Sequence, residues 1–406
     1  MRRLFLIGLV PALAWLVSCN GTAPSPEPQR PSQQRPSALV RPSPSPNPNR
    51  EIPFQAVSSD RDPDDVGRFL AGMPGTEGSP FKPLENEEAW QLHRRESDPV
   101  WAHVEDRWFP PMREFQKKEL SGPPIENGRV FYPFSGPDTM MITVFFPHSP
   151  EYVLIGLEPA GTLPAPQKLP PEKLAGYLAD VRETVSSVLQ RSFFITRDMD
   201  KEFRGQVTDG LIPPILMLLV RTHHTVLGMR YVRLDEEGRV IERPANYMPP
   251  GKIGNKGVEI DFRTDEDQSV HKLLYFSVNL ADDRLRQNKP FLTYLDGLKG
   301  VTTFFKATSY MPHQPGFDTI REQVMANSVA ILQDDSGIPY RFYAAPGWQV
   351  QLFGDYEKPY GSFGWLEQPD LRKAYSTLSP KPLGFRLGYG FSKVPSNLLL
   401  AKRSGI

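Results

Sequence analysis

Adjacent carboxylates mark one polar loop of the chain. Asp334 and Asp335 precede Ser336-Gly337, and Tyr340 and Arg341 follow a few residues later. Two neighbouring carboxylates could bind a hard cation, raise one another's pKa or orient a sugar hydroxyl. The same residues also suit a turn, in which aspartate caps backbone amides and glycine takes a positive φ. Both interpretations, a turn and a site, stay open from sequence.

Other polar residues fall in loops that could lie beside this pair. His313 precedes an expected helix, Asp138 closes a turn rich in Gly and Pro, and Glu158 follows an expected strand. Loops at the ends of strands and helices are where functional residues gather. The catalytic candidates are therefore Asp334, Asp335, His313 and Asp138, and the ligand-binding candidates are Glu158, Tyr340 and Arg341.

The common catalytic motifs are absent. The sequence contains no GxSxG elbow, HExxH zinc helix, GxxxxGK phosphate loop or EF-hand loop. His223 and His224 are neighbours beside an expected strand, where successive side chains face opposite ways, so they cannot readily share one metal. We therefore expect no metal site, and the sequence identifies no cofactor.

Cys19 is the only cysteine, and it ends an N-terminal apolar stretch. Arg2 and Arg3 form a short positive region, and Leu4–Val17 is apolar but too short to span a bilayer as a permanent helix. The stretch is typical of an export signal. With no second thiol, disulfides and thiolate metal sites are excluded.

The run Leu16-Val17-Ser18-Cys19 resembles the lipobox of bacterial lipoproteins. The resemblance implies that diacylglycerol is joined to Cys19, that residues 1–18 are removed, and that the new N-terminus is often acylated too. Several acyl chains on one residue hold a protein on a bilayer essentially for good. We therefore expect an extracytoplasmic protein on the cell membrane or outer membrane. Asn20 favours the outer membrane without deciding it.

The beginning of the chain leaves the export route open as well. Arg2-Arg3-Leu4-Phe5-Leu6 also resembles the core of a twin-arginine signal, which exports folded proteins, although ordinary Sec export is favoured.

Composition separates a tether from a folded body. Residues 19–50 are dense in Pro, Ser and Gln, a composition that cannot bury a core, so they predict a disordered linker after the lipidated cysteine. Residues 51–406 predict one globular domain, with a loosely packed lead-in over 51–83. Lys+Arg and Asp+Glu both number 47, so no basic field exists to hold nucleic acid.

Short β-branched and aromatic runs predict strands over 130–134, 139–146, 152–157 and 216–222. Apolar residues at helical spacing predict helices over 171–190 and 317–332, and a helix over 85–119 broken at its prolines. Strands come in clusters between helices. This order favours an α+β or mixed α/β fold with a largely antiparallel sheet over a doubly wound parallel fold.

Four strings of this body resemble a set of uncharacterised bacterial exported proteins. They are Tyr132–Asp138, Gly156–Gly161, Gln333–Arg341 and Ser396–Ala401. The resemblance runs from about Val130 to Ala401 and implies one continuous domain, but it brings no activity with it.

Two functions fit these observations. The favoured one is a lipid-anchored envelope protein whose head binds a polar ligand, such as a cell-wall glycan, or an envelope partner. The alternative is an envelope hydrolase that uses the carboxylates of Asp334, Asp335 and Asp138 with His313. Whether the protein is an enzyme stays open.

We predict that Cys19→Ala releases the protein from the membrane, because the variant lacks the one thiol that can carry diacylglycerol. The wild type and a Ser32→Ala linker control should sediment with membranes and incorporate labelled palmitate. The Cys19 variant should be soluble and unlabelled. If that variant still partitioned into the detergent phase, lipidation at this residue would be ruled out as the anchor.

Overall fold

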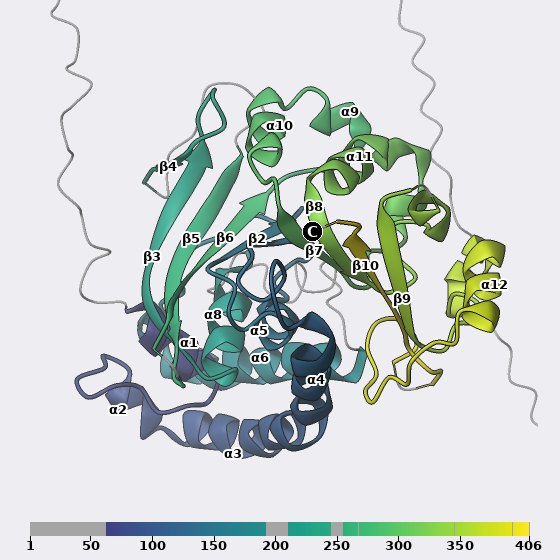
Figure 1. Ribbon diagram of the computed structural model, residues 1–406. Coiled ribbons are helices and arrows are strands. Elements are labelled where there is room, and N and C mark those ends of the chain that lie inside the picture. The colour runs from purple at the N-terminus through teal and green to yellow at the C-terminus, as the bar shows by residue number, and fades with distance from the viewer. Residues whose placement is uncertain are drawn as a thin grey trace, which may run out of the picture. The chain divides into compact units, whose positions relative to one another are not determined.

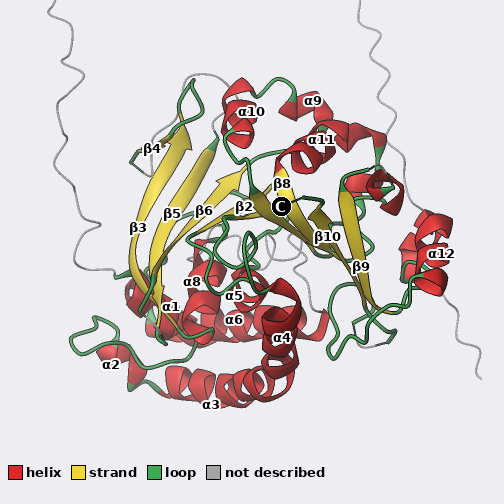
Figure 2. Ribbon diagram, viewed as in Figure 1, coloured by secondary structure: helices red, strands yellow, loops and turns green. Residues whose placement is uncertain are grey.

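A ten-stranded mixed sheet divides the folded body, and helices pack against both of its faces (Figure 1). The computed structural model describes residues 62–191, 210–244, 255–266, 268–344, 346–391 and 393–405. Cys19, the signal over 1–18 and the linker over 19–50 lie outside the described residues. The distribution of helices and strands, coloured in Figure 2, confirms the α+β class.

The sheet has antiparallel ends and a parallel middle. Its strand order is β4-β3-β5-β6-β2-β1-β7-β8-β10-β9. The antiparallel pairings expected from sequence join β4, β3, β5 and β6 at one end and β8, β10 and β9 at the other. The strands are β1 (Val130–Tyr132), β2 (Glu151–Gly156), β3 (His224–Leu234), β4 (Val240–Glu242), β5 (Lys256–Thr264), β6 (Val270–Ser277), β7 (Val301–Phe305), β8 (Ser328–Gln333), β9 (Trp348–Gly354) and β10 (Asn397–Arg403).

Parallel pairings join the middle strands in the order β6-β2-β1-β7-β8. The chain lays β2 and β6 on one side of β1 and then β7 and β8 on the other. The direction of winding therefore reverses between β1 and β7. Connections that leave neighbouring strands in opposite directions open a crevice at the carboxyl ends of those strands.

The described helices from α1 to α6, together with α8, lie on one face of the sheet, and α9 to α11 lie on the other (Figure 1). None of the described helices is long and apolar enough to cross a membrane. The α-helices are α1 (Pro63–Leu70), α2 (Lys82–Glu85), α3 (Glu88–His103), α4 (Phe109–Phe115), α5 (Thr139–Phe145), α6 (Pro171–Arg191), α8 (Ile212–Arg221), α9 (Asp282–Leu285), α10 (Lys289–Asp296), α11 (Asp318–Asn327) and α12 (Pro369–Thr377). Two π-helices are η1 (Val104–Trp108) and η2 (Gln116–Leu120), and the 3-10 helices are η3 (Pro166–Lys168), η4 (Met311–His313), η5 (Pro315–Phe317), η6 (Tyr340–Tyr343) and η7 (Gly361–Leu366).

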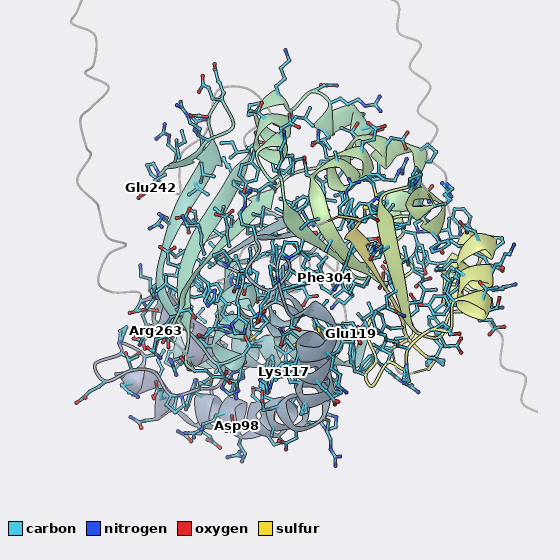
Figure 3. All side chains as sticks on the ribbon, in the orientation of Figure 1. Asp98, Lys117, Glu119, Glu242, Arg263 and Phe304 are labelled. Carbon is cyan, nitrogen blue, oxygen red and sulfur yellow. The ribbon has the colours of Figure 1, made fainter. Side chains whose placement is uncertain are left out.

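Each face of the sheet has its own hydrophobic core. In β1, Val130 and Tyr132 enter the core under α1 to α8, whereas Phe131 enters the core under α9 to α11. This alternation follows from the two-residue period of a strand. Phe304 of β7, labelled in Figure 3, packs in the first core with its ring centroid 5.6 Å from that of Phe145 in α5.

The segment expected as a loosely packed lead-in (51–83) is packed tightly where the structure describes it. Helix α1 buries Val66 and Phe69 completely, and the Phe69 ring stacks 5.0 Å from that of Phe81. Trp90 of α3 covers this cluster and donates its indole N–H to the Phe69 carbonyl at 3.1 Å. Helix α1 and Phe81 of this segment therefore belong to the core, whereas residues 73–78 between them are half-buried or exposed.

Two apolar segments predicted as strands are helices. Of residues 139–146, all but the last form α5, which is buried along its whole length, and 216–222 belong mostly to α8, which is almost entirely buried. A helix buried on every side has no polar face, so its sequence resembles that of a buried strand. The signals at the helix starts are the better guide. Asp138 caps α5 by accepting from the Met141 N–H, and Pro213-Pro214 opens α8.

Other boundaries also differ from the sequence prediction. The helix expected over 317–332 ends at Asn327, and its last third is strand β8, where β-branched residues suit a sheet. Asp334 and Asp335 therefore follow a strand rather than a helix. Pro99 lies inside a continuous α3 and does not break it.

We predict that Trp90→Ala lowers the free energy of unfolding by about 3–5 kcal/mol, because it empties a fully buried site beside α1. Trp365→Ala is the matched control, since that side chain is 74% exposed and its removal should change stability by no more than about 0.5 kcal/mol. Urea denaturation of both variants measures the difference. Equal effects would mean that the lead-in is not part of the core.

Candidate functional site

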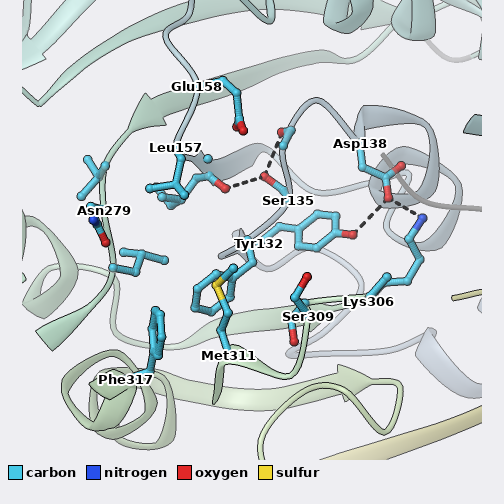
Figure 4. A pocket seen from close by; sticks show the side chains of 18 of the residues that line it. Tyr132, Ser135, Asp138, Leu157, Glu158, Asn279, Lys306, Ser309, Met311 and Phe317 are labelled. Atoms are coloured by element: carbon cyan, nitrogen blue, oxygen red, sulfur yellow. Dashed lines mark hydrogen bonds and ion pairs between the residues drawn. The ribbon is translucent and has the colours of Figure 1, made fainter. Parts of the chain in front are cut away.

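A cavity of about 340 Å³ lies at the carboxyl ends of β1, β2, β6 and β7, where the winding of the sheet reverses (Figure 4). The loop that follows each of these four strands contributes to its wall. This is the place at which parallel sheets usually bind ligands, because the diverging connections leave room there. Its position makes the cavity the leading candidate for the functional site.

A buried ion pair forms one side of the cavity. The Lys306 Nζ, at the end of β7, lies 2.6 Å from Asp138 Oδ2, and both side chains are almost fully buried. The Tyr132 hydroxyl donates to the same oxygen at 3.0 Å, and Asp138 Oδ1 accepts from the Met141 N–H at 3.4 Å. Among the described residues, Asp138 is the only partner of the lysine, which can donate three hydrogen bonds. The ammonium can therefore also donate to a ligand.

The hydroxyl of Tyr132 remains neutral in this setting. Burial first, and the negative charge of Asp138 second, hold the pKa of Tyr132 well above its ordinary value. The side chain is therefore a hydrogen-bond donor and not a base.

The loop after β1 turns tightly beside this pair. Phe134 adopts a left-handed backbone with a φ of 61°, which is uncommon for a bulky residue. The Ser135 N–H donates to the Ile155 carbonyl at 2.9 Å, and its hydroxyl lies within hydrogen-bond distance of the Gly136 and Ile155 carbonyls. The Ser135 oxygen can still accept a hydrogen bond from a bound molecule.

Glu158 lies on the wall supplied by β2, in a loop fastened to β6. The Tyr275 hydroxyl donates to the Glu158 carbonyl at 2.6 Å, and the Ser277 hydroxyl donates to the Leu157 carbonyl at 3.1 Å. Gly156 permits this close approach, since a Cβ there would lie 2.5 Å from the Tyr275 oxygen. The half-buried carboxylate of Glu158 has no hydrogen-bond or ion-pair partner among the described residues.

Most of the remaining wall is apolar. Its main residues are Phe134, Leu157, Val278, Leu280, Met311 and Phe317. A largely apolar lining with a few fixed polar groups is the usual composition of a site for a small organic molecule.

The loop after β7 completes the wall in a strained conformation. Ala307, Ser309 and Tyr310 all have φ values between 52° and 55°, in the left-handed region. Each such non-glycine residue costs about 1–3 kcal/mol, so the surrounding structure must hold the loop in place.

Asp334 holds this strained loop. Its Oδ2 accepts from the Ala307 N–H at 2.8 Å, and its Oδ1 accepts from the Ser336 N–H at 3.0 Å. The Ser336 hydroxyl in turn accepts from the Thr308 N–H at 2.9 Å. The polar loop after β8 thus acts as a structural turn that positions the wall of the cavity.

Both carboxylate oxygens of Asp335 also accept hydrogen bonds from other residues of the protein. Its Oδ2 accepts from the Tyr310 hydroxyl at 2.6 Å, and its Oδ1 accepts from the Asn397 amide at 3.0 Å. His313 Nε2 and the Gln368 amide both donate to the Asp335 carbonyl at 3.1 Å. Burial lowers the pKa of His313 to about 4, so this histidine is a neutral donor to the main chain.

The structure separates the four catalytic candidates into two places. Asp334, Asp335 and His313 meet in the turn after β8, whereas only Asp138 lines the cavity. Burial, followed by repulsion from Asp335, raises the pKa of Asp334 to about 7, and burial also raises the pKa of Asp335.

The ligand-binding candidates divide as well. Glu158 lines the cavity, but Tyr340 and Arg341 do not. The Tyr340 N–H donates to the side-chain amide oxygen of Gln368 at 2.8 Å. The exposed Arg341 guanidinium lies 5.0 Å from the centre of the Phe342 ring. These two residues therefore have structural contacts outside the cavity.

Sequence reasoning missed Lys306. The available signal was a lysine placed directly after β7, a strand buried at all five positions, where a solvated charge is not expected. Ser309, Met311 and Phe317 carried no comparable signal, because they belong to the irregular loop that the turn after β8 positions.

No family model matches the chain, and no curated protein or solved structure is significantly similar to it. Within the described ranges, no group of three or more His, Cys, Asp or Glu side chains is placed to hold a metal ion. The interpretation of the site therefore depends on its geometry and chemistry.

Asp334→Asn should cost about 1–3 kcal/mol at pH 5, because an amide presents hydrogens to donors that the carboxyl oxygens now satisfy. The raised pKa of Asp334 means that the folded protein binds a proton there which the unfolded chain releases above about pH 4. The stabilisation that comes from this bound proton is therefore lost as the pH rises towards 7. The difference in stability between wild type and variant should shrink between pH 5 and pH 8.

Urea denaturation at both pH values measures this difference, and taking the difference removes the opposite contribution of buried histidines such as His93 and His224. A difference that stayed constant or grew with pH would contradict the raised pKa.

Proposed function

We propose that this chain is a lipid-anchored envelope protein whose folded head binds a small organic molecule in the cavity at the winding reversal. The anchor is supported by the lipobox-like run that ends at Cys19. The binding function is supported by one observation above the others. A cavity with an apolar wall and a fixed polar side occupies the crevice between β1 and β7.

The cavity has the properties of a preformed site. Its volume of about 340 Å³ lies within the range of ordinary ligand pockets, roughly 300–1,000 Å³. The ion pair of Lys306 and Asp138 is formed by side chains of the protein itself, and the backbone of the Glu158 loop is hydrogen-bonded to β6. Little ordering is therefore required on binding, which favours affinity.

The site supports ligand binding better than it supports hydrolysis, for which Asp334, Asp335 and Asp138 were the expected catalytic carboxylates. The oxygens of Asp334 and Asp335 are occupied by donors of the protein itself, and Asp138 is neutralised by Lys306. The apolar wall also suits a partly apolar molecule better than a free glycan.

Filling the cavity should abolish binding. Ala281 lines the cavity at the start of α9, so Ala281→Phe should place a ring in the space that a ligand would occupy. Ala102→Phe on the exposed surface of α3 is the matched control. In saturation-transfer NMR with a fragment mixture of amines, alcohols and carboxylates, wild type and Ala102→Phe should bind a common subset that Ala281→Phe no longer binds.

Melting curves of both variants check that each one folds. If folded Ala281→Phe bound the same fragments as wild type, or if wild type bound none, the proposed function would be wrong.

A further inference from the structure

The charge inside the cavity is unbalanced. Its charged lining residues are Asp138, Glu158 and Lys306. Lys306 and Asp138 lie 2.6 Å apart and neutralise each other, both almost fully buried. Glu158 has no such partner among the described residues, so it is the uncompensated charge of the lining. Counted over the described residues, the lining therefore carries one net negative charge.

The carboxylate of Glu158 is placed for an incoming ligand. Figure 4 shows it directed toward Ser135, across from the side chain of Lys306. Its main chain is fixed by the Tyr275 hydroxyl at 2.6 Å, and its neighbour Leu157 is fixed by Ser277 at 3.1 Å. These bonds hold the backbone of Glu158 at the cavity wall. A half-buried carboxylate is only partly hydrated, which increases the gain from a cationic partner.

The rest of the lining limits which other groups a cationic ligand can carry. Beside Glu158, the wall consists of apolar side chains such as Leu157, Leu280 and Phe317. On the other side, Lys306 has hydrogens left to donate to a neutral oxygen. A second positive charge on the ligand would be repelled by the ammonium of Lys306, and a negative charge would be repelled by the carboxylate of Glu158.

We propose that the cavity selects a small amine with a single positive charge and an apolar body. This inference rests on the proposed function. The ammonium group binds the Glu158 carboxylate and the Ser135 oxygen, and the apolar body packs against Leu157, Leu280 and Phe317. A hydroxyl or carbonyl oxygen on the ligand accepts a hydrogen bond from Lys306. Glu158 is then the residue that determines specificity.

Three probes of matched shape test the charge preference. They are 2-phenylethylamine, 2-phenylethanol and phenylacetate, which carry a positive charge, no charge and a negative charge at neutral pH. Titrations followed by NMR should show the amine binding at least about tenfold more tightly than the alcohol, and phenylacetate binding most weakly. Tenfold corresponds to about 1.4 kcal/mol, which is within the range of a hydrogen bond to a charged group.

Glu158→Gln keeps the shape of the side chain and removes its charge, so it should bring the amine to the level of the alcohol while leaving the alcohol nearly unchanged. Glu322→Gln, an exposed position on α11, removes the same charge from the surface and should leave the preference intact. Because the Glu158 carboxylate has no partner in the part of the chain that the structure describes, its variant should fold, and a melting curve verifies this.

The outcomes separate this inference from the proposed function. If the probes bind in a manner blocked by Ala281→Phe but without preference for the amine, the inference is wrong and the proposed function stands. A preference that survives in Glu158→Gln also overturns the inference. If other fragments bind in the cavity while all three probes fail, the amine class is wrong. If no fragment binds at all, the proposed function fails with it.

Discussion

The buried ion pair between Lys306 and Asp138 joins the end of β7 to the loop that follows β1, and the winding of the sheet reverses between these two strands. Either charge alone would be uncompensated in the protein interior, and breaking such a pair by removing one partner costs about 3–5 kcal/mol. Because this pair lies where the connections diverge, it keeps a polar side on a crevice that is otherwise lined by apolar residues. The chemistry available to the cavity depends on it.

The turn after β8 supports the same cavity by holding the loop after β7, which forms part of the cavity wall. Three left-handed residues in the β7 loop cost about 1–3 kcal/mol each, which is comparable to the net contribution of a hydrogen bond, about 0.5–1.5 kcal/mol between neutral groups and up to about 3 kcal/mol with a charged one. Asp334, Ser336 and Asp335 provide such bonds to Ala307, Thr308 and Tyr310 in turn. The two effects nearly offset each other, so the loop keeps its conformation only while the turn is intact. Adjacent carboxylates serve here to position a wall.

How much of this could be predicted from sequence depended on how local the signal was. Strands β1 and β2 and helix α6 were predicted closely, because their apolar residues follow one clear period. Helices α5 and α8 were missed because burial on all sides removes that period. Asp334 and Glu158 were recognised as polar residues in loops, but their roles depend on partners far away in the chain. Lys306 illustrates the limit, since Asp138 lies well before it in sequence and only the topology brings them together.

Strand β10 has a consequence for the order in which the sheet can be completed. It lies between β8 and β9 and pairs with both, although it follows them in the sequence. Until residues 397–403 have been synthesised, β9 has no neighbouring strand in the sheet and β8 presents an open edge. Open edges invite pairing with other chains. The cavity depends on the same late segment, because the Asn397 amide of β10 donates to Asp335 in the turn that holds the cavity wall, and the Tyr389 hydroxyl accepts from the Ser309 N–H. The exposed sheet edge is therefore closed and the cavity wall is fixed by the same late segment of the chain.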